Sequence, residues 1–230
     1  MIGRNLKQIQ QHITDITDKC GRPKDSVRLV AVSKRFPVDA IREAGEAGQY
    51  LFGENYIQEA QQKYELLGED YKFHFIGHLQ SNKAKIAARI FSMIETIDSI
   101  KLASTLNKHL EVIDRKLDIL VQVNIGLDCN KSGTTAAATE ELLKKIANLS
   151  MLRPRGLMTM PPFTADPEGS RPYFRELRQL SEQLRQKDLF YDSKFVELSM
   201  GMTNDYHIAI EEGATLVRIG TAIFGQRQIH

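Results

Sequence analysis

Lys34 follows the apolar segment 29–33 (LVAVS), which has the composition of a buried strand. Side chains alternate across a strand, so Lys34 is predicted to point the same way as Val30 and Val32. Burial and the neighbouring cation Arg35 would both favour the neutral amine, the form that attacks an aldehyde. The alternative is a lysine just past the strand end whose ammonium reaches solvent, as most lysines do.

A later segment, 198–202 (LSMGM), has the composition of a phosphate-binding loop. It ends a strand-like run and leads into a predicted helix that begins near Asn204. Backbone N–H groups at the start of a helix, backed by the helix dipole, suit a phosphate. Gly201 would allow a ligand close to the backbone, and Ser199 would donate a hydroxyl.

The next strand-like run ends in the segment 217–221 (VRIGT) and offers a second half for such a site. Gly220 and Thr221 close it, although this glycine, like the one before it, is also compatible with a simple turn. Arg218 lies in the middle of the run, and a buried guanidinium requires an acceptor. That acceptor is either a ligand atom or a structural carboxylate, for which the candidates are Asp98 and Asp118.

Eight strand-like runs must position these side chains. They are 28–34, 50–55, 72–78, 93–98, 118–124, 154–160, 195–201 and 216–221. Amphipathic helices are predicted around and between them, at 2–19, 37–47, 55–67, 81–91, 99–115, 135–149, 172–187 and 204–212. Such alternation predicts parallel strands joined by helical crossovers. We therefore expect a single (β/α)8 barrel over 1–230, with 1–20 as an additional N-terminal helix, and a doubly wound open sheet as the alternative.

Polar or unusual residues gather near the carboxyl ends of these runs, and this favours the barrel. They are Lys34, Asn55, His78, Asp98, Asn124, Met160, Ser199 and Gly220. In barrels of this kind the carboxyl-terminal face carries the chemistry, and the loops after strands seven and eight are the recurrent phosphate position.

Composition argues against several other classes of protein. The 31 basic and 29 acidic residues are interspersed, which gives no basis for a nucleic-acid partner or a membrane surface. No apolar run approaches the ~20 residues that cross a bilayer, and residues 1–20 lack the apolar centre of a secretory signal. Cys20 and Cys129 suggest no disulfide scaffold. A cytoplasmic protein is expected, with a monomer as the default state.

Six segments also carry a resemblance to a known family. They are 29–34 (LVAVSK), 52–56 (FGENY), 74–83 (HFIGHLQSNK), 155–158 (RGLM), 198–202 (LSMGM) and 217–225 (VRIGTAIFG). In this order, and over nearly the whole chain, they resemble the pyridoxal phosphate homeostasis proteins, the YggS/PROSC family.

The resemblance implies a barrel similar to the N-terminal domain of alanine racemases, the fold-type III group that binds pyridoxal 5′-phosphate (PLP). It implies that Lys34 holds PLP as a Schiff base and that Arg218 faces the pyridine nitrogen. The other matched positions lie near the phosphate (Ser199, Gly201, Gly220 and Thr221) or beside the ring (Asn55 and Met158). Members of the family are associated with PLP homeostasis and have no established catalytic reaction.

A cation beside the pyridine nitrogen disfavours its protonation and so weakens the ring as an electron sink. Racemisation also needs a second acid or base on the opposite face, which alanine racemases take from another domain. The sequence after the eighth run leaves no room for one. We therefore expect a PLP carrier rather than an enzyme, with PLP-dependent apo-enzymes as acceptors of released PLP.

Two enzymatic alternatives remain open at this point. One is a small racemase-like enzyme that uses PLP. The other is an aldolase-like barrel in which Lys34 attacks a sugar phosphate directly.

No metal site is predicted: His74 and His78 share one face of a strand, but a third ligand is missing.

Overall fold

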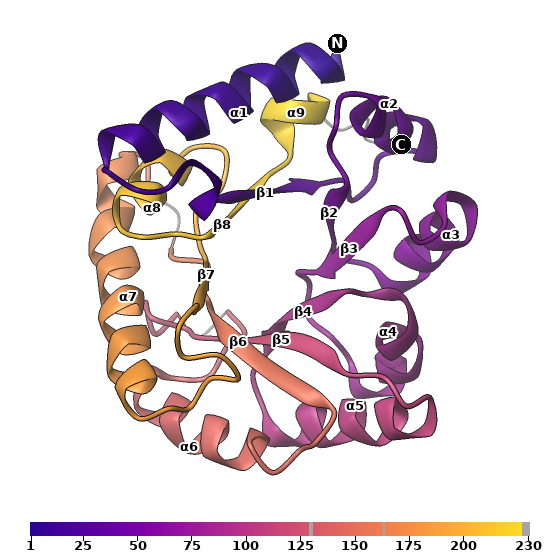
Figure 1. The fold of residues 1–230 in the computed structure, drawn as a ribbon, viewed down its shortest axis with the longest axis vertical. Helices are drawn as coiled ribbons and strands as arrows, with labels where there is room; N and C mark the ends of the chain where they lie inside the picture. Colours follow the sequence, from indigo (N-terminus) through magenta and orange to yellow (C-terminus); the bar gives the residue numbers. More distant parts are fainter. Residues whose placement is uncertain (129–130, 163, 227–230) are drawn as a thin grey trace.

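The computed structural model of the chain describes residues 1–128, 131–162 and 164–226. Eight strands close into a barrel in the order β1-β2-β3-β4-β5-β6-β7-β8 (Figure 1). Every neighbouring pair is parallel, including β1 with β8. The predicted (β/α)8 barrel is confirmed, and the open-sheet alternative is wrong because β8 pairs with β1 instead of forming an edge.

The strands are shorter at their carboxyl ends than the sequence predicts. They are β1 (Arg28–Val32), β2 (Leu51–Glu54), β3 (Lys72–Phe75), β4 (Met93–Ile97), β5 (Leu117–Gln122), β6 (Leu152–Met158), β7 (Glu197–Ser199) and β8 (Leu216–Ile219). The last residues of the predicted runs leave the sheet and turn into the loops. Lys34, Asn55 and His78 therefore lie just beyond their strands.

Helices surround the barrel as an outer ring (Figure 1). They are α1 (Ile2–Lys19), α2 (Val38–Glu46), α3 (Ile57–Leu67), α4 (Ala84–Ile90), α5 (Ile100–Val112), α6 (Ala136–Ile146), α7 (Arg171–Gln186), α8 (Tyr206–Glu211) and α9 (Thr221–Phe224). The single turn of α9 was not predicted. None of the helices in the described residues is long and apolar enough to cross a membrane.

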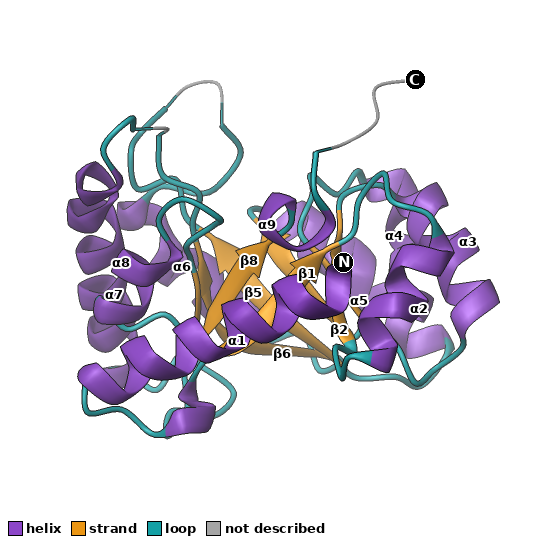
Figure 2. Ribbon diagram, turned by 90° about the horizontal axis from the view of Figure 1, so that it is seen from above, coloured by secondary structure: helices purple, strands orange, loops and turns teal. Residues whose placement is uncertain are grey.

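The additional N-terminal helix α1 runs across the outside of the barrel (Figure 2) and contacts α2, α8 and α9. Its apolar stripe is buried, as the spacing predicts: Leu6, Ile9, Ile13 and Ile16. Cys20 follows it as an exposed free cysteine, whereas Cys129 lies outside the described residues.

The main hydrophobic core lies between the sheet and the helices. A second apolar cluster is formed by strand residues that face the barrel interior: Val30, Met93, Leu120, Met158 and Leu216. Val30 thus points inward, as strand alternation predicts. Above and beside this cluster the interior also holds ionisable side chains, and these belong to the candidate site.

Candidate functional site

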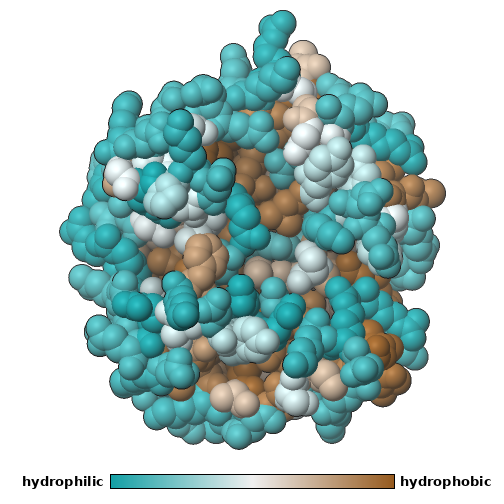
Figure 3. Space-filling model, viewed as in Figure 1, coloured by the Kyte–Doolittle hydropathy of each residue, from teal (hydrophilic) through white to brown (hydrophobic). Residues whose placement is uncertain are grey.

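Two cavities of similar size lie at opposite ends of the barrel. One, of about 660 Å³, is at the ends where β1 to β5 begin; Figure 3 views that side and shows apolar side chains in a hollow near its centre. The other, of about 670 Å³, lies among the loops at the carboxyl ends of the strands. The second is the candidate site, because it is the one that predicted site residues line.

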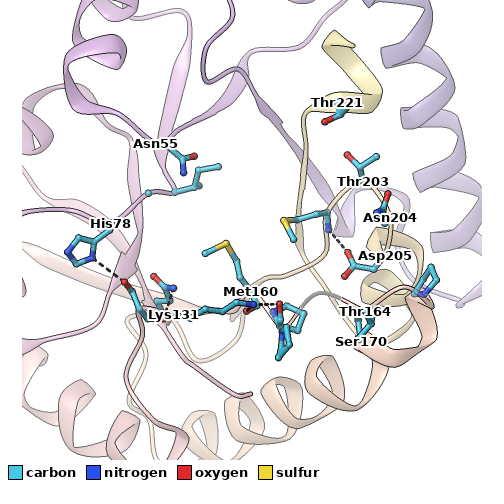
Figure 4. Close-up of a pocket in the computed structure, with 18 residues that line it drawn as sticks. Asn55, His78, Lys131, Met160, Thr164, Ser170, Thr203, Asn204, Asp205 and Thr221 are labelled. Atoms are coloured by element: carbon cyan, nitrogen blue, oxygen red, sulfur yellow. Dashed lines mark hydrogen bonds between the residues drawn. The ribbon is translucent and has the colours of Figure 1, made fainter. Parts of the chain in front are cut away.

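Figure 4 shows side chains from several loops around this carboxyl-end cavity. Asn55 and His78 follow β2 and β3, Met160 follows β6, and Thr203 and Thr221 follow β7 and β8. His78 Nδ1 lies 3.3 Å from the Ser132 hydroxyl at the rim. The cavity therefore lies on the face where a barrel places its chemistry.

Asn55 presents an unused acceptor at this cavity. Its Oδ1 is buried, and within the described part of the chain it has no hydrogen-bond partner. Gly77 permits this placement, because a Cβ there would lie 2.4 Å from the backbone oxygen of Asn55. An unpaired buried polar group costs about 1–3 kcal/mol. A ligand with a hydrogen-bond donor would relieve that cost, so the wall fits a polar ligand.

Lys34 lies between two of the positions that form the cavity wall. β1 pairs with β2 on one side and with β8 on the other, and these two strands lead to Asn55 and Thr221. The lysine is half-buried, and in the described structure its neighbours, not Lys34 itself, line the cavity. The reason predicted for its direction is wrong: β1 ends at Val32, so strand alternation does not orient Lys34.

A tight turn orients Lys34 instead. The backbone N–H of Phe36 donates to the carbonyl of Ser33 at 3.0 Å, and Arg35 has a left-handed φ of 65°. The guanidinium of Arg35 lies 5.7 Å from the centre of the Tyr56 ring. Its charge is thus turned toward the exposed surface, where salt screens its effect on the lysine.

Arg218 lies on β8 inside the barrel, 3% exposed. Its Nη1 donates to the Ser199 hydroxyl at 2.5 Å, and its Nη2 donates to the carbonyl of Thr159 at 2.8 Å. Nη1 also lies 3.9 Å from Oε2 of Glu95. Burial lowers the pKa of Arg218, and the charge of Glu95 opposes that shift.

The carboxylate beside Arg218 is not one of the two that the sequence suggested. Asp98 is partly exposed beyond β4, and Asp118 lies 2.6 Å from Arg153. Glu95 lies in the middle of β4, where the segment 93–97 (MIETI) is buried throughout. The sequence signal that could have identified Glu95 is a carboxylate within an apolar strand. Arg218 was singled out by the same kind of signal, an arginine within the apolar strand β8.

Glu95 also accepts hydrogen bonds from two other buried side chains. His74 Nδ1 lies 2.7 Å from its Oε1, and the Ser199 hydroxyl donates to its Oε2 at 2.5 Å. Burial alone would raise the pKa of this carboxyl, but the hydrogen bond and charge of His74, with Arg218 and Ser199, hold it below its ordinary value. His74 thus faces the barrel interior and His78 the rim, so they do not share a site.

The two predicted residues at and just after the end of β7 have structural partners. The Ser199 hydroxyl is buried and engaged by the carboxylate and guanidinium just described. Gly201 has a φ of 90°, and a Cβ there would lie 2.5 Å from Cβ of Ala209, so glycine lets α8 pack closely. The hydroxyl-bearing residues that line the cavity after β7 and β8 are Thr203 and Thr221. Sequence reasoning missed Thr203.

The predicted helix at 204–212 begins later, at Tyr206, and has only six residues. Its start is delayed because the side chain of Asp205 accepts the N–H of Met202 at 2.7 Å and closes a turn first. So short a helix offers a phosphate less dipole stabilisation than the predicted helix would.

The remaining predicted residues lie close to the cavity without lining it. Met158 packs in the apolar interior cluster, and Met160, two residues later, lines the cavity. Gly220 brings the end of β8 against β1, since a Cβ there would lie 3.1 Å from the carbonyl oxygen of Val32. The predicted residues thus separate into two that line the cavity (Asn55, Thr221), two that follow the neighbouring strands β1 and β8 (Lys34, Gly220), and four that lie deeper in the barrel or behind its loops (Met158, Ser199, Gly201, Arg218).

Comparison with known proteins defines the class first. The model of the alanine racemase N-terminal domain matches residues 4–228. The chain is 43% identical over 229 residues to the pyridoxal phosphate homeostasis protein of Pasteurella multocida, covering 98% of this chain and 97% of that one. It is 39% identical over 230 residues to the protein of the same name from Escherichia coli K12, with coverage of 98% and 97%.

Solved structures agree with this assignment. PipY of Synechococcus elongatus, in the structure with PLP bound, is 34% identical with a TM-score of 0.86, covering 98% of this chain and 100% of that one. The PipY structure without PLP is 36% identical with a TM-score of 0.88 at the same coverage. The chain belongs to the family of the pyridoxal phosphate homeostasis proteins, so the resemblance drawn from the six sequence segments is confirmed.

Proposed function

We propose that this protein binds PLP in the carboxyl-end cavity, holds it covalently on Lys34, and serves PLP homeostasis. The observation that carries the proposal is that Lys34 follows β1, which lies between the strands that lead to Asn55 and Thr221, and both of these residues line a cavity of about 670 Å³. It is supported by a relative with PLP bound that shares the fold over its whole length.

The residues present fit such a ligand. Lys34 would hold PLP covalently through its Nζ amine, which is a suitable nucleophile for an aldehyde. The hydroxyls of Thr203 and Thr221 would donate to the phosphate, and Oδ1 of Asn55 would accept a hydrogen bond. Bound PLP supplies an electrophilic carbon and a ring that can take up negative charge.

Arg218 supports a carrier over an efficient enzyme. In the orientation that the family resemblance implies, this cation would face the pyridine nitrogen and disfavour its protonation. Hydrogen bonds from Arg218 to Ser199 and Thr159 hold its guanidinium in the barrel. We propose further that the protein acts in the cytoplasm, as a monomer, and gives up PLP to apo-enzymes that need it.

Titration with PLP, followed by borohydride reduction and peptide mass mapping, tests the proposal. We expect the label on Lys34 and a loss of the covalent absorbance in Lys34→Ala. Lys101→Ala, which changes an exposed lysine on α5, is the matched control and should bind PLP as the wild type does. A label on another lysine, with Lys34 unmodified in a loaded sample, would overturn the assignment.

A further inference from the structure

The backbone around Lys34 is tied to a buried ionic cluster on α3 and β2. Lys63 on α3 is 4% exposed. Its Nζ donates to the carbonyl of Ser33 at 2.8 Å and lies 2.6 Å from carboxylate oxygens of both Glu54 and Glu59. A buried ammonium is costly unless it is paired and hydrogen-bonded, and here three acceptors surround it. One of those acceptors belongs to the residue before Lys34.

The residue after Lys34 is held by the same cluster. The backbone N–H of Arg35 donates to Oε1 of Glu59 at 2.5 Å, the oxygen that also contacts Lys63. The Ser33 hydroxyl donates to Oε1 of Glu54 at 2.6 Å. The chain is therefore fixed on both sides of Lys34, through one carbonyl, one hydroxyl and one N–H.

The conformation that these contacts hold is an unfavourable one. Arg35 is not a glycine, yet its φ is 65°, and a left-handed residue with a side chain costs about 1–2 kcal/mol. Such a residue persists where its surroundings fix it. Glu59 supplies that constraint directly, because it binds the N–H of Arg35 itself.

The position of the cluster argues that it does more than attach α3 to the barrel. The pair of Lys63 with Glu54 already joins α3 to β2. The contacts to Ser33 and Arg35 go to a third element, the turn after β1, and they flank the one residue of that turn with an amine. A small relaxation of this turn would displace the side chain of Lys34 relative to Asn55 and Thr221.

We propose that Glu59 and Lys63 are positioning residues that hold the Lys34 amine where it reacts with an aldehyde in the cavity. The proposal rests on the proposed function of Lys34. Glu59 acts through the N–H of Arg35 and Lys63 through the carbonyl of Ser33, so neither needs to touch the ligand.

The test compares Glu59→Ala, Glu59→Gln and Lys63→Arg with Glu65→Ala, an exposed glutamate on the same helix. One readout is the rate of covalent reaction with PLP. A second does not depend on PLP: reductive methylation with formaldehyde and cyanoborohydride, with Lys34 quantified against Lys101 in the same sample by peptide mapping. Thermal unfolding of each variant shows that it is folded.

We expect Glu59→Ala to slow the reaction of Lys34 with PLP by at least about tenfold, since a displacement of 1 Å from a reactant held in a site can cost as much as a hundredfold in rate. The methylation rate of Lys34 should change as well, because the surroundings of its amine change. The methylation rate of Lys101 should be unchanged. Glu59→Gln keeps an acceptor for the N–H of Arg35 and should recover most of the rate, as should Lys63→Arg, which keeps the cation. Glu65→Ala should match the wild type in every readout.

Folded Glu59→Ala protein whose Lys34 reacts at the wild-type rate would overturn the proposal and leave the cluster a simple anchor for α3. If Glu59→Ala does not fold, Glu59→Asp carries the test, because it keeps the charge beside Lys63 but withdraws the carboxylate from the N–H of Arg35. We expect it to slow the reaction of Lys34 with PLP, and a Lys34 rate at the wild-type level, or a methylation rate lost equally at Lys34 and Lys101, would also overturn the proposal. Failure of the proposed function of Lys34 would give a different result from failure of the positioning proposal. PLP would then label a lysine other than Lys34 in the wild type, whereas the formaldehyde comparison would still report on the turn.

Discussion

The carboxylate of Glu95 and the guanidinium of Arg218 lie 3.9 Å apart inside the barrel, and the hydroxyl of Ser199 bonds to both. Neither charged side chain reaches solvent to any useful extent. Each charge therefore depends on the other, because an uncompensated charge in a low-dielectric interior is very costly. His74 completes the group through its hydrogen bond to Glu95.

Glu95→Gln should destabilise the protein strongly. The substitution keeps the shape of the side chain but leaves Arg218 without a neighbouring carboxylate. Breaking a buried pair in this way costs roughly 3–5 kcal/mol. Unfolding in denaturant measures the change, and Glu176→Gln, on the exposed face of α7, serves as the control with little effect. A loss no larger than that of the control would mean that the pair contributes nothing.

The difference in unfolding free energy between the wild type and Glu95→Gln should also depend on pH. The pKa of Glu95 is lowered in the folded protein, so the unfolded chain binds a proton more readily than the folded one does. The stabilisation by Glu95 is then fully present above the ordinary carboxyl pKa of roughly 4.3 and is lost as the pH falls through the lower folded value. The gap in unfolding free energy between wild type and Glu95→Gln should be constant near neutral pH and narrow in acid. A gap that widened on acidification would contradict the direction of the shift.

Asn55→Ala should separate a role in binding from a role in folding. Because Oδ1 of Asn55 has no hydrogen-bond partner within the described residues, its removal should leave the stability of the PLP-free protein unchanged or slightly higher. PLP binding should weaken by about tenfold, which is ~1.4 kcal/mol. Equilibrium titration and thermal unfolding measure the two effects, with Asn148→Ala on the protein surface as control. Unchanged affinity together with lowered stability would show that Asn55 is structural.

Gly201→Ala should reveal how much the β7–α8 turn depends on glycine. A Cβ at Gly201 would meet Cβ of Ala209 at 2.5 Å, and the φ of 90° is strained for any other residue. Strain of about 1–2 kcal/mol and overpacking of about 1–3 kcal/mol should add. Gly48→Ala is the matched control: its φ is also 90°, but nothing lies within 4 Å of the added carbon, so only the strain should appear. Equal losses in the two variants would rule out the packing contribution.

The sequence by itself determined the barrel architecture and the end of the barrel that carries the candidate site. Alternation of apolar strands with amphipathic helices depends on local periodicity, and it predicted the eight strands and the buried stripe of α1. The same pattern placed Asn55 and Thr221 at the carboxyl ends of their predicted strands, and both line the cavity. These predictions agree with the structure because a strand or helix must present its apolar face to a core, whatever its neighbours are.

Tertiary structure alone decided how the site is held together. Ser199 and Glu95 are 104 residues apart in the chain, and only closure of the barrel brings β4 opposite β7 and β8. Lys63 and Glu59 on α3 likewise contact the turn after β1, at Ser33 and Arg35. Local periodicity carries no information about either contact, because each forms between elements whose separation is fixed by the whole fold. That is why sequence reasoning placed Lys34 in a strand that ends before it and offered Arg218 the wrong carboxylates.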